Sequence, residues 1–439
     1  MVRMTILRYN YRITCEDSKV HRNAIRCLGV CYKSANLMIE RCNEDLRSGR
    51  KVDLQSAYTW ATRDAKKTKA LAYLRKASSV AVQQACNDVR LAYMRFFGKK
   101  SKPPRFRRYS DPRSARFVGT AFKVEGNRLY LANIGWATFR MSRPLPSAPT
   151  SATLILETDG KLYVSFVVEL SEALLPKAGA DCGIDVGMRR YATIASAKPD
   201  DSVEIYAVAS LATLVQKSEK RQRRLEKRLA RKRGPNRKAK VTASRNWKKV
   251  RRQLSKAQLK QRRIRRDAIH QLSHRLTRDH DLISIETLNV KAMAKQLGRS
   301  VQRNPIGGLL REIEQKAKRR GRSVVHASPF FPSSKTCSSC RSVYKGLQRN
   351  TKAWTCPSCG ASHDRDGNAS VNLLRLTGRM AVPRDTRELM PCSVRLHRTP
   401  PSQEGGLRGR LRASAVSTVE VGAPHGEGTC AGDGVRSQA

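Results

Sequence analysis

Apolar and polar residues alternate along two parts of the first half of the chain, and this alternation predicts β-strands. It occurs in residues 3–15 and again in the stretches FKVEGNRLYL and ATLILETDGKLYVSFVVEL. A Gly-Asn dipeptide at 126–127 and an Asp-Gly dipeptide at 159–160 interrupt these stretches, and both accept positive φ at little cost, which favours hairpin turns. We therefore predict a small antiparallel barrel or sheet built from residues 3–15 and 115–170.

The segment between these strands, residues 18–98, has apolar residues at helical spacing. The period of 3.6 is clear in Cys86, Val89 and Tyr93, and Gly98 is placed to end the helix. We therefore predict a helical insertion within the β-structure.

The second half of the chain opens with a predicted linker, residues 171–180, and a predicted strand, GIDVG, whose neighbour YATIAS is expected to pair with it. Residues 217–267 then have helical spacing and hold 24 Lys and Arg against three acids, with a break at Gly234-Pro235 that predicts two helices. A solvated helix face normally mixes both signs of charge, so we interpret this run as a nucleic-acid contact. The apolar stretch DLISIE that follows is a predicted strand.

The charge of the whole chain favours the same partner. It has 88 Lys and Arg against 35 Asp and Glu, a formal net charge of +53. A compact fold with this excess would repel itself unless a polyanion shared its volume, and a sequence pI of about 10.8 favours nucleic acid. At 39% hydrophobic residues, the chain can still form real cores.

Two further features concern location and the C-terminal end. No stretch approaches the roughly 18 consecutive apolar residues of a membrane span, and the first residues lack the apolar block of a signal peptide. We therefore expect a soluble cytoplasmic protein, associated with the nucleoid and without a membrane partner. After Gly378 the chain has scattered Pro and Gly and no sustained period, so we predict a disordered tail over residues 379–439.

Four cysteines form two C-x-x-C pairs separated by 15 residues, CSSC and CPSC. Each pair lets one tight knuckle present two thiolates, and two knuckles complete a tetrahedral zinc site. Four cysteine ligands leave no open coordination position, so the Zn²⁺ ion should be structural, and a redox dithiol would need only one pair. We predict a zinc ribbon held by Cys337, Cys340, Cys356 and Cys359.

Three carboxylates are candidates for metal-ion catalysis. Asp185 lies in the strand GIDVG, Glu286 ends the strand DLISIE, and Asp366 stands at the start of an amphipathic helix. Taken singly, the first two could be strand-end turn residues and Asp366 a helix N-cap. Acids at two strand ends and one helix start can nevertheless converge on one edge of a sheet. Their oxygens would suit Mg²⁺, and two such ions about 4 Å apart can serve phosphodiester hydrolysis.

The ordered set GIDVG, DLISIETLNVKAM, SSKTCSSC and WTCPSCGASHDRDGNAS resembles the TnpB family of transposon-encoded RNA-guided DNA endonucleases, over most of residues 3–378. These proteins have a RuvC-like nuclease of the RNase H fold and are related to small type V CRISPR effectors. The resemblance places the family's catalytic, Mg²⁺-binding acids on Asp185, Glu286 and Asp366, and its zinc ligands on the four cysteines. Asp364 matches the motif but not the metal-binding role.

The resemblance also implies an α/β multidomain architecture. A wedge β-barrel would carry a helical recognition domain, and a RuvC-like nuclease domain with a basic helical insert would carry the zinc ribbon as a target-nucleic-acid-binding module. The implied boundaries are 1–17 and 99–172 for the wedge, 18–98 for the recognition domain, 179–328 and 361–378 for the nuclease, 211–278 for its insert, and 329–360 for the zinc ribbon.

The activity implied is cleavage of double-stranded target DNA with two Mg²⁺ ions, directed by a transposon-derived guide RNA (omega RNA) and a short target-adjacent motif. Two alternatives stay open: a nuclease-silent RNA-guided DNA-binding repressor, and an RNA-independent RuvC-type nuclease or transposition accessory protein. Gln83, Gln84 and Arg90, on one helix flank, are candidate nucleic-acid contacts, with an ordinary polar helix face as the alternative. Two departures from the family pattern, Arg341 where Gly is common and Thr287 where Asp is common, remove no ligand.

Overall fold

The computed structural model describes residues 2–108, 113–200, 202–236, 239, 241–348, 350–378 and 390–392. None of the helices in these ranges is long and apolar enough to cross a membrane.

A seven-stranded antiparallel sheet, in the order β2-β6-β7-β1-β5-β4-β3, contains the strands predicted in the first half of the chain. The turn glycines Gly126 and Gly160 have φ angles of 55° and 80°, as the predicted hairpins require. On its inner face the rings of Tyr11 and Phe139 lie 5.3 Å apart, and those of Phe139 and Phe166 also lie 5.3 Å apart. The strands are β1 (Val2–Thr14), β2 (Arg113–Val118), β3 (Phe122–Glu125), β4 (Arg128–Leu131), β5 (Gly135–Arg140), β6 (Pro149–Leu156) and β7 (Leu162–Ala173).

The helical insertion shares its core with this sheet. It contains α1 (Ser18–Arg47), α2 (Leu54–Thr59) and α3 (Ser79–Phe97), and Gly98 caps α3 as predicted. Residues 60–76 form a π turn and short 3₁₀ segments instead of a continuous helix. The hydroxyl of Thr62 donates to the carbonyl of Tyr58 (2.8 Å), a local hydrogen bond that competes with regular helix geometry.

The second sheet has six strands in the order β12-β11-β8-β9-β10-β15. β8 is parallel to β11, and β11 to β12, whereas β9 is antiparallel to both β8 and β10. These strands are β8 (Asp181–Val186), β9 (Arg190–Ala197), β10 (Val203–Ala209), β11 (Leu282–Ile285), β12 (Ser323–His326) and β15 (Met390–Cys392). The predicted disordered tail lies outside the described residues except for β15, which pairs with β10.

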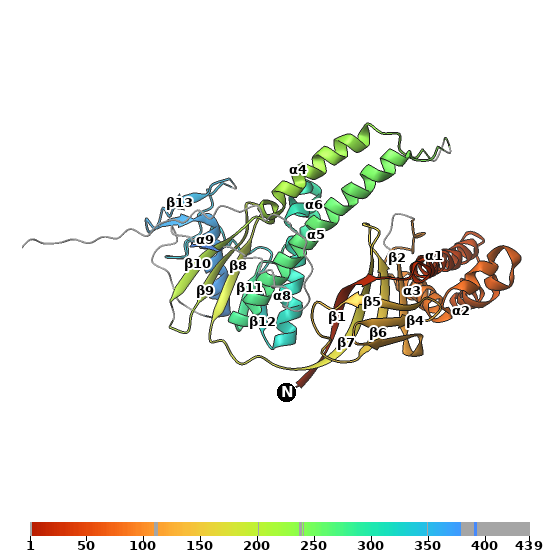
Figure 1. The fold of residues 1–439 in the computed structure, drawn as a ribbon. Coiled ribbons are helices and arrows are strands. Elements are labelled where there is room, and N and C mark those ends of the chain that lie inside the picture. Colours follow the sequence, from red (N-terminus) through yellow and green to blue (C-terminus); the bar gives the residue numbers. More distant parts are fainter. Residues whose placement is uncertain are drawn as a thin grey trace, which may run out of the picture. The chain divides into compact units, whose positions relative to one another are not determined.

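Helices cover both faces of the second sheet (Figure 1). On one face, apolar residues of β8 and β11 pack against α5 (Arg245–Asp279) and α8 (Ile306–Arg320). On the other face, α9 (Arg365–Leu374) packs against β8 and β9 through Val371 and Leu374. The remaining helices include α6 (Val290–Leu297), α7 (Arg299–Arg303) and the 3₁₀ turns Gly119–Ala121 and Arg375–Thr377.

The predicted break in the basic segment is confirmed, because α4 (Leu211–Ala230) and α5 are separate antiparallel-packed helices. A short apolar seam of Leu225, Val250 and Leu254 joins them. The rest of their length within 217–267 carries the Lys and Arg side chains, most of them exposed. The two helices therefore form a hairpin with a narrow apolar interface and a strongly cationic exterior.

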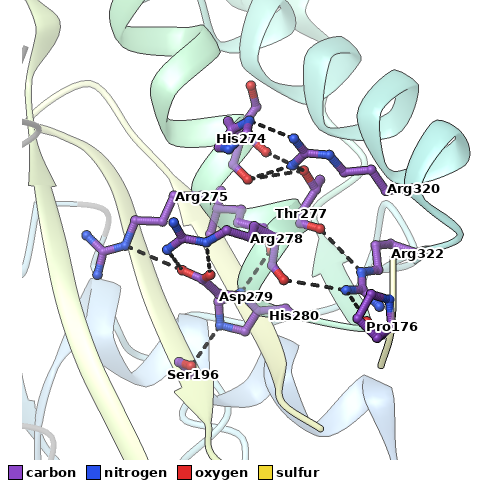
Figure 2. A network of polar contacts seen from close by, with 12 residues as sticks. Pro176, Ser196, His274, Arg275, Thr277, Arg278, Asp279, His280, Arg320 and Arg322 are labelled. Carbon is purple, nitrogen blue, oxygen red and sulfur yellow. Dashed lines mark hydrogen bonds and ion pairs between the residues drawn. The ribbon is translucent and has the colours of Figure 1, made fainter. Parts of the chain in front are cut away.

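Arg320, at the end of α8, and Arg322, two residues later, donate hydrogen bonds to the last turn of α5 (Figure 2). Arg320 Nη1 donates to Oγ1 of Thr277 (2.7 Å), and Arg322 Nε donates to the carbonyl of Thr277 (3.3 Å). Arg322 Nη2 also donates to the carbonyl of Pro176 (2.8 Å), in the predicted linker 171–180. The last carbonyls of a helix lack intrahelical partners, so these guanidinium groups both cap α5 and fix the linker.

Arg322→Ala is expected to lower the free energy of unfolding by about 3–5 kcal/mol, because it removes the buried guanidinium that pairs with the partly buried Asp281. The side chain of Arg322 is 3% exposed. Arg278→Ala is the matched control, since its side chain is 61% exposed and pairs with the adjacent Asp279; it should cost less than about 1 kcal/mol. Urea unfolding of both variants measures the difference, and equal losses would contradict the assignment.

Strand β8 and helix α9 approach each other too closely for a side chain at Gly183. A Cβ atom there would lie 2.1 Å from the backbone N of Leu374 and 2.3 Å from the carbonyl O of Ser370. Both atoms belong to the backbone of α9, so the helix itself would have to move. This close approach sets the distance between the strand and the C-terminal half of α9.

Gly183→Ala is therefore expected to lower the free energy of unfolding by about 3 kcal/mol or more. Gly29→Ala is the control, because Gly29 lies within α1 and a Cβ there meets nothing within 4 Å. That change should raise the stability by about 0.5–1 kcal/mol through helix propensity. Urea unfolding of the two variants gives the comparison, and a Gly183→Ala protein as stable as the parent would refute the argument.

Candidate active site and metal centre

Two of the predicted acids lie side by side at one edge of the second sheet. The parallel register pairs Ile285 of β11 with Ile184 of β8, so the next residues along, Glu286 and Asp185, occupy adjacent positions. Asp185 is also two residues from Gly183 on the same strand, and side chains at i and i+2 share a face. Asp185 therefore projects from the face of β8 that α9 covers.

The third acid, Asp366, lies in the first turn of α9. The N-cap is Asp364, whose Oδ1 accepts from the backbone N–H of Gly367 (3.0 Å), so the alternative that Asp366 is itself the cap is wrong. Arg190 Nη1 lies 2.6 Å from Oδ1 of Asp364 and 3.5 Å from Oδ2 of Asp366. Asp364 thus fixes the helix start, and Asp366 presents its carboxylate beside it.

The pKa of Asp185 reflects the charges of the other two acids. Burial raises its pKa well above the ordinary value, and the negative charges of Glu286 and Asp366 raise it further. Burial also raises the pKa of Glu286, against the opposing effects of a hydrogen bond from Ser333 and the charge of Arg365. Glu286 and Asp366 therefore lie near enough to act on the charge of Asp185 within a partly enclosed site.

The three carboxylates do not form a closed ligand cluster. Within the described ranges, only the four cysteines place their ligand atoms all within 4.8 Å of one another. Oε1 of Glu286 instead accepts from Ser333 Oγ (2.6 Å), and Oδ2 of Asp366 lies 3.4 Å from Arg189 Nη2. Like charges repel, and these partners hold two of the acids slightly apart.

The cysteines come together as the predicted four-sulfur site. The Sγ atoms of Cys337 and Cys359 are 3.7 Å apart, and those of Cys340 and Cys356 are 3.6 Å apart. Burial raises the pKa of Cys337, whereas a hydrogen bond from Ser342 lowers the pKa of Cys340. Strands β13 (Ala353–Thr355) and β14 (Ser362–Asp364) flank the second pair. Four sulfurs at this spacing form a cage that suits a structural Zn²⁺ ion.

The two knuckles share one backbone geometry. The N–H of Arg341 donates to the carbonyl of Cys337 (3.0 Å), and the N–H of Gly360 donates to that of Cys356 (2.9 Å). Arg341 and Gly360 have φ angles of 67° and 70°. Left-handed backbone costs a non-glycine residue about 1 kcal/mol or more, so Arg341 is strained where Gly360 is not.

Arg341→Gly is therefore expected to raise the stability of the metal-loaded protein by about 1 kcal/mol. The reciprocal change, Gly360→Ala, should lower it by about the same amount because it introduces a Cβ at the same φ. The midpoint of thermal unfolding, measured with equal zinc content, checks both signs. Shifts in the same direction for the two variants would show that φ does not control this knuckle.

Sequence reasoning missed the groups that connect the cysteine site to the acids. Nδ2 of Asn368 donates to the carbonyl of Thr336 (2.7 Å), and its Oδ1 accepts from the N–H of Ser338 (2.8 Å). Nδ2 of Asn372 donates to the carbonyl of Ser333 (2.8 Å), and Ser333 donates to Glu286. The only available signal was the position of both asparagines one helical turn apart in DRDGNASVN.

His363 and Thr287 were also without an assigned role. Nε2 of His363 lies 3.1 Å from Sγ of Cys337, and its ring packs 5.0 Å from that of Trp354. The hydroxyl of Thr287 donates to the carbonyl of Ala327 (2.7 Å), so the residue after Glu286 ties β11 to the chain beyond β12.

The candidate nucleic-acid contacts lie on α3. Gln83 is exposed and Gln84 is half-buried. Arg90 Nη2 donates to Oδ1 of Asn87 (2.9 Å), and its guanidinium lies 5.9 Å from the ring centroid of Tyr58. The guanidinium thus has partners within the fold, and Gln83 is the most accessible of the three.

Comparison with known proteins places both parts of the site within matched regions. A family described as "Probable transposase" (OrfB_IS605) matches residues 165–297, and the "Cas12f1-like, TNB domain" matches residues 307–373. A relative from Streptomyces pristinaespiralis, named "Putative RNA-guided DNA endonuclease", is 35% identical over 316 residues, which are 70% of this chain and 74% of the relative. The chain belongs to the TnpB family.

More distant similarity extends further along this TnpB chain. The protein "Putative RNA-guided DNA endonuclease InsQ" of Escherichia coli (strain K12) is 26% identical over 80% of this chain and 87% of its own length. A solved structure described as a Cas12f1-sgRNA-target DNA complex aligns with a TM-score of 0.48 and 12% identity, covering 85% of this chain and 98% of the other. The first two acids of this TnpB protein fall in the first matched family region, and the third acid and the cysteines fall in the second.

Proposed function

We propose that this TnpB protein is an RNA-guided DNA endonuclease whose catalytic residues are Asp185, Glu286 and Asp366. The observation that carries the proposal is the placement of these three carboxylates, at the ends of two adjacent parallel strands and in the first turn of α9, where Glu286 and Asp366 act on the charge of Asp185. The names of the S. pristinaespiralis and E. coli relatives support the same activity.

The topology supports a RuvC-like nuclease of the RNase H fold. In chain order, β8, β9 and β10 form an antiparallel meander, and β11 and β12 then add in parallel on the other side of β8. Asp185 lies on β8, in the middle of these five strands, and Glu286 directly follows the neighbouring strand β11. The division into wedge, recognition, nuclease and zinc-ribbon domains at the expected boundaries belongs to the same proposal.

The residues present fit the divalent cations that such a nuclease uses. Three carboxylates supply hard oxygen ligands, and the like charges that raise the pKa of Asp185 are those that a cation would neutralise. Asp185, Glu286 and Asp366 would hold two Mg²⁺ ions, which activate water and stabilise the leaving oxygen in phosphodiester hydrolysis. Ser333 orients Glu286, and Arg189 and Arg190 hold Asp366 at the helix start.

The charge distribution supports guide RNA and target DNA as partners. In RNA-guided systems base pairing carries the sequence information, and the protein grips phosphates. The exposed Lys and Arg of the α4–α5 hairpin suit that role, and binding through them should weaken steeply as salt rises. Zn²⁺, held by the four cysteines, would be structural and keep the adjoining loops in place.

Sequencing the RNA that copurifies with the protein, followed by a cleavage assay, tests the proposal. We expect one RNA species, and Mg²⁺-dependent cutting only of plasmids that match its guide segment beside a short adjacent motif. Guided binding without cutting would favour the repressor alternative, although all three acids are present. Cutting by RNA-free protein would favour the RNA-independent nuclease.

A further inference from the structure

Phe330 is the most exposed large apolar side chain among the described residues, at 93%. It lies in the segment SPFFPSS, between β12 and the first cysteine knuckle. An aromatic ring left almost wholly in water forgoes the stabilisation that burial would give it. The contacts of the segment that carries the ring should therefore show why the ring is held in solvent.

The segment that carries Phe330 is fixed at both sides of the ring. The N–H of Phe331 donates to the carbonyl of Ser328 (3.0 Å), and the N–H of Ser333 donates to the carbonyl of Phe331 (2.9 Å). Pro329 and Pro332 each lock one φ angle and remove one backbone donor. Phe330 is thus held on a constrained turn instead of a long flexible loop.

The same turn reaches directly to the carboxylates. Ser333, three residues after Phe330, is 4% exposed and donates to Oε1 of Glu286 at 2.6 Å. Asn372 of α9 donates to the carbonyl of Ser333 (2.8 Å), so the end of the turn is held from a second side. The backbone that carries Phe330 is therefore anchored, three residues further on, to one of the acids.

We propose that Phe330 is a stacking site for one base of the DNA strand whose phosphodiester the carboxylates attack. This inference rests on the proposed function and adds a binding site to it. Carboxylates and their cations act on the sugar–phosphate backbone and leave the bases unheld. An exposed ring stacks on any base without sequence preference, which suits a nuclease that takes its specificity from a guide.

The charges beside the acids favour a nucleic acid over an apolar protein partner. Arg189 Nη2 and Arg190 Nη1 lie 3.4 Å and 3.5 Å from Oδ2 of Asp366. An exposed aromatic ring, on a segment tied to a site that also has cationic side chains, is a combination that binds single strands. Stacking at Phe330 would fix the register of the strand, and so the phosphodiester presented to the acids.

The test combines a Phe330 variant with DNA that carries one abasic residue, moved stepwise through the cleavage region. Phe330→Ala should slow guided cleavage about 10- to 100-fold, as expected for loss of one stacked base. With the parent protein, one abasic position should slow cleavage by a similar factor. With Phe330→Ala, that same position should have no further effect, because the contact is already lost.

Three further variants separate stacking from other roles. Phe330→Trp should restore cleavage, whereas Phe330→Leu, which is apolar but lacks a flat ring, should behave like Phe330→Ala. Val343→Ala is the matched control, because Val343 is an exposed apolar residue (48%) of the same module and should cut like the parent. Guided binding of the Phe330→Ala protein, measured by mobility shift, should stay within about twofold of the parent.

The outcomes distinguish this inference from the proposed function. If the parent cuts its guided target and Phe330→Ala cuts equally fast, the stacking site is refuted while the endonuclease assignment stands. The stacking site is also refuted if every abasic position slows cleavage by the same factor in the Phe330→Ala protein as in the parent. A parent protein that carries RNA but cuts no matched target refutes the endonuclease itself.

Discussion

Asp185→Asn is expected to abolish guided DNA cleavage, by about a thousandfold or more, while leaving guided binding intact. The amide keeps the size of the side chain but removes one of the three carboxylates at the sheet edge. Binding depends instead on guide pairing and on cationic surfaces such as the α4–α5 hairpin. Single-turnover cleavage and mobility-shift assays on the same target separate the two quantities.

The same substitution should stabilise the protein when no Mg²⁺ is added. Burial and the charges of Glu286 and Asp366 raise the pKa of Asp185, so its ionised form is disfavoured in the folded state. Removing that unfavourable charge should therefore raise the stability of the folded protein at neutral pH. Thermal unfolding measures it, without a chelator that would also remove zinc.

The sign of the pH dependence follows from linkage. A carboxyl whose pKa is higher folded than unfolded binds more protons in the folded state, so stability falls as pH rises through the interval between the two values. For Asp185 that interval begins near 3.8 and extends upward. The advantage of Asp185→Asn should therefore be small near pH 4 and grow toward neutrality.

Asp364→Asn is the matched control, two residues from Asp366. Asp364 caps α9 and pairs with Arg190; Asn keeps the cap but loses the ion pair, so the change should cost about 1 kcal/mol of stability or less and leave cutting largely intact. A protein with Asp185→Asn that still cuts, or one with Asp364→Asn that is as inactive, would overturn the assignment of roles among these acids.

The sequence was sufficient where structure is decided locally. Asp159-Gly160 specifies its turn through the φ angles that two residues accept, and each C-x-x-C pair forms its knuckle within five residues. The break between α4 and α5 was visible for the same reason, because Gly234 and Pro235 interrupt the helical spacing. The approach of Asp185 to Glu286 could also be anticipated, because both stand at strand ends of one sheet.

What could not be predicted depends on contacts between distant segments. Ser333, Asn368 and Asn372 look like ordinary polar residues until α9 brings them together, and Gly183 looks like a weak point of a strand until α9 fills the space of its missing side chain. The prediction of regular helix over residues 60–76 was wrong for a different reason. Their apolar spacing suits a helix, but periodicity does not register the competing hydrogen bond of Thr62.

Loss of the cysteine-bound metal is expected to disable cleavage even though every acid remains. Cys356→Ser removes one of the four sulfurs, and a knuckle without its metal loses most of what holds its shape. The first knuckle begins at Cys337, four residues after Ser333, and α9 grips this segment at Ser333, Thr336 and Ser338. Disorder in the knuckle would therefore reach the hydrogen bond that orients Glu286.

We expect Cys356→Ser to lose its zinc and to cut at least about 100-fold more slowly, while still binding guide RNA. Elemental analysis gives the zinc content, and limited proteolysis should reveal new cleavage between β12 and α9. Cys15→Ser is the control, because Cys15 is a half-buried free cysteine far along the chain from the cluster and should change neither property. For the parent protein stripped of metal, Zn²⁺ together with Mg²⁺ should restore cutting, and Mg²⁺ alone should not. Full activity of a zinc-free protein would mean that α9 holds Ser333 and Glu286 in place without the ribbon.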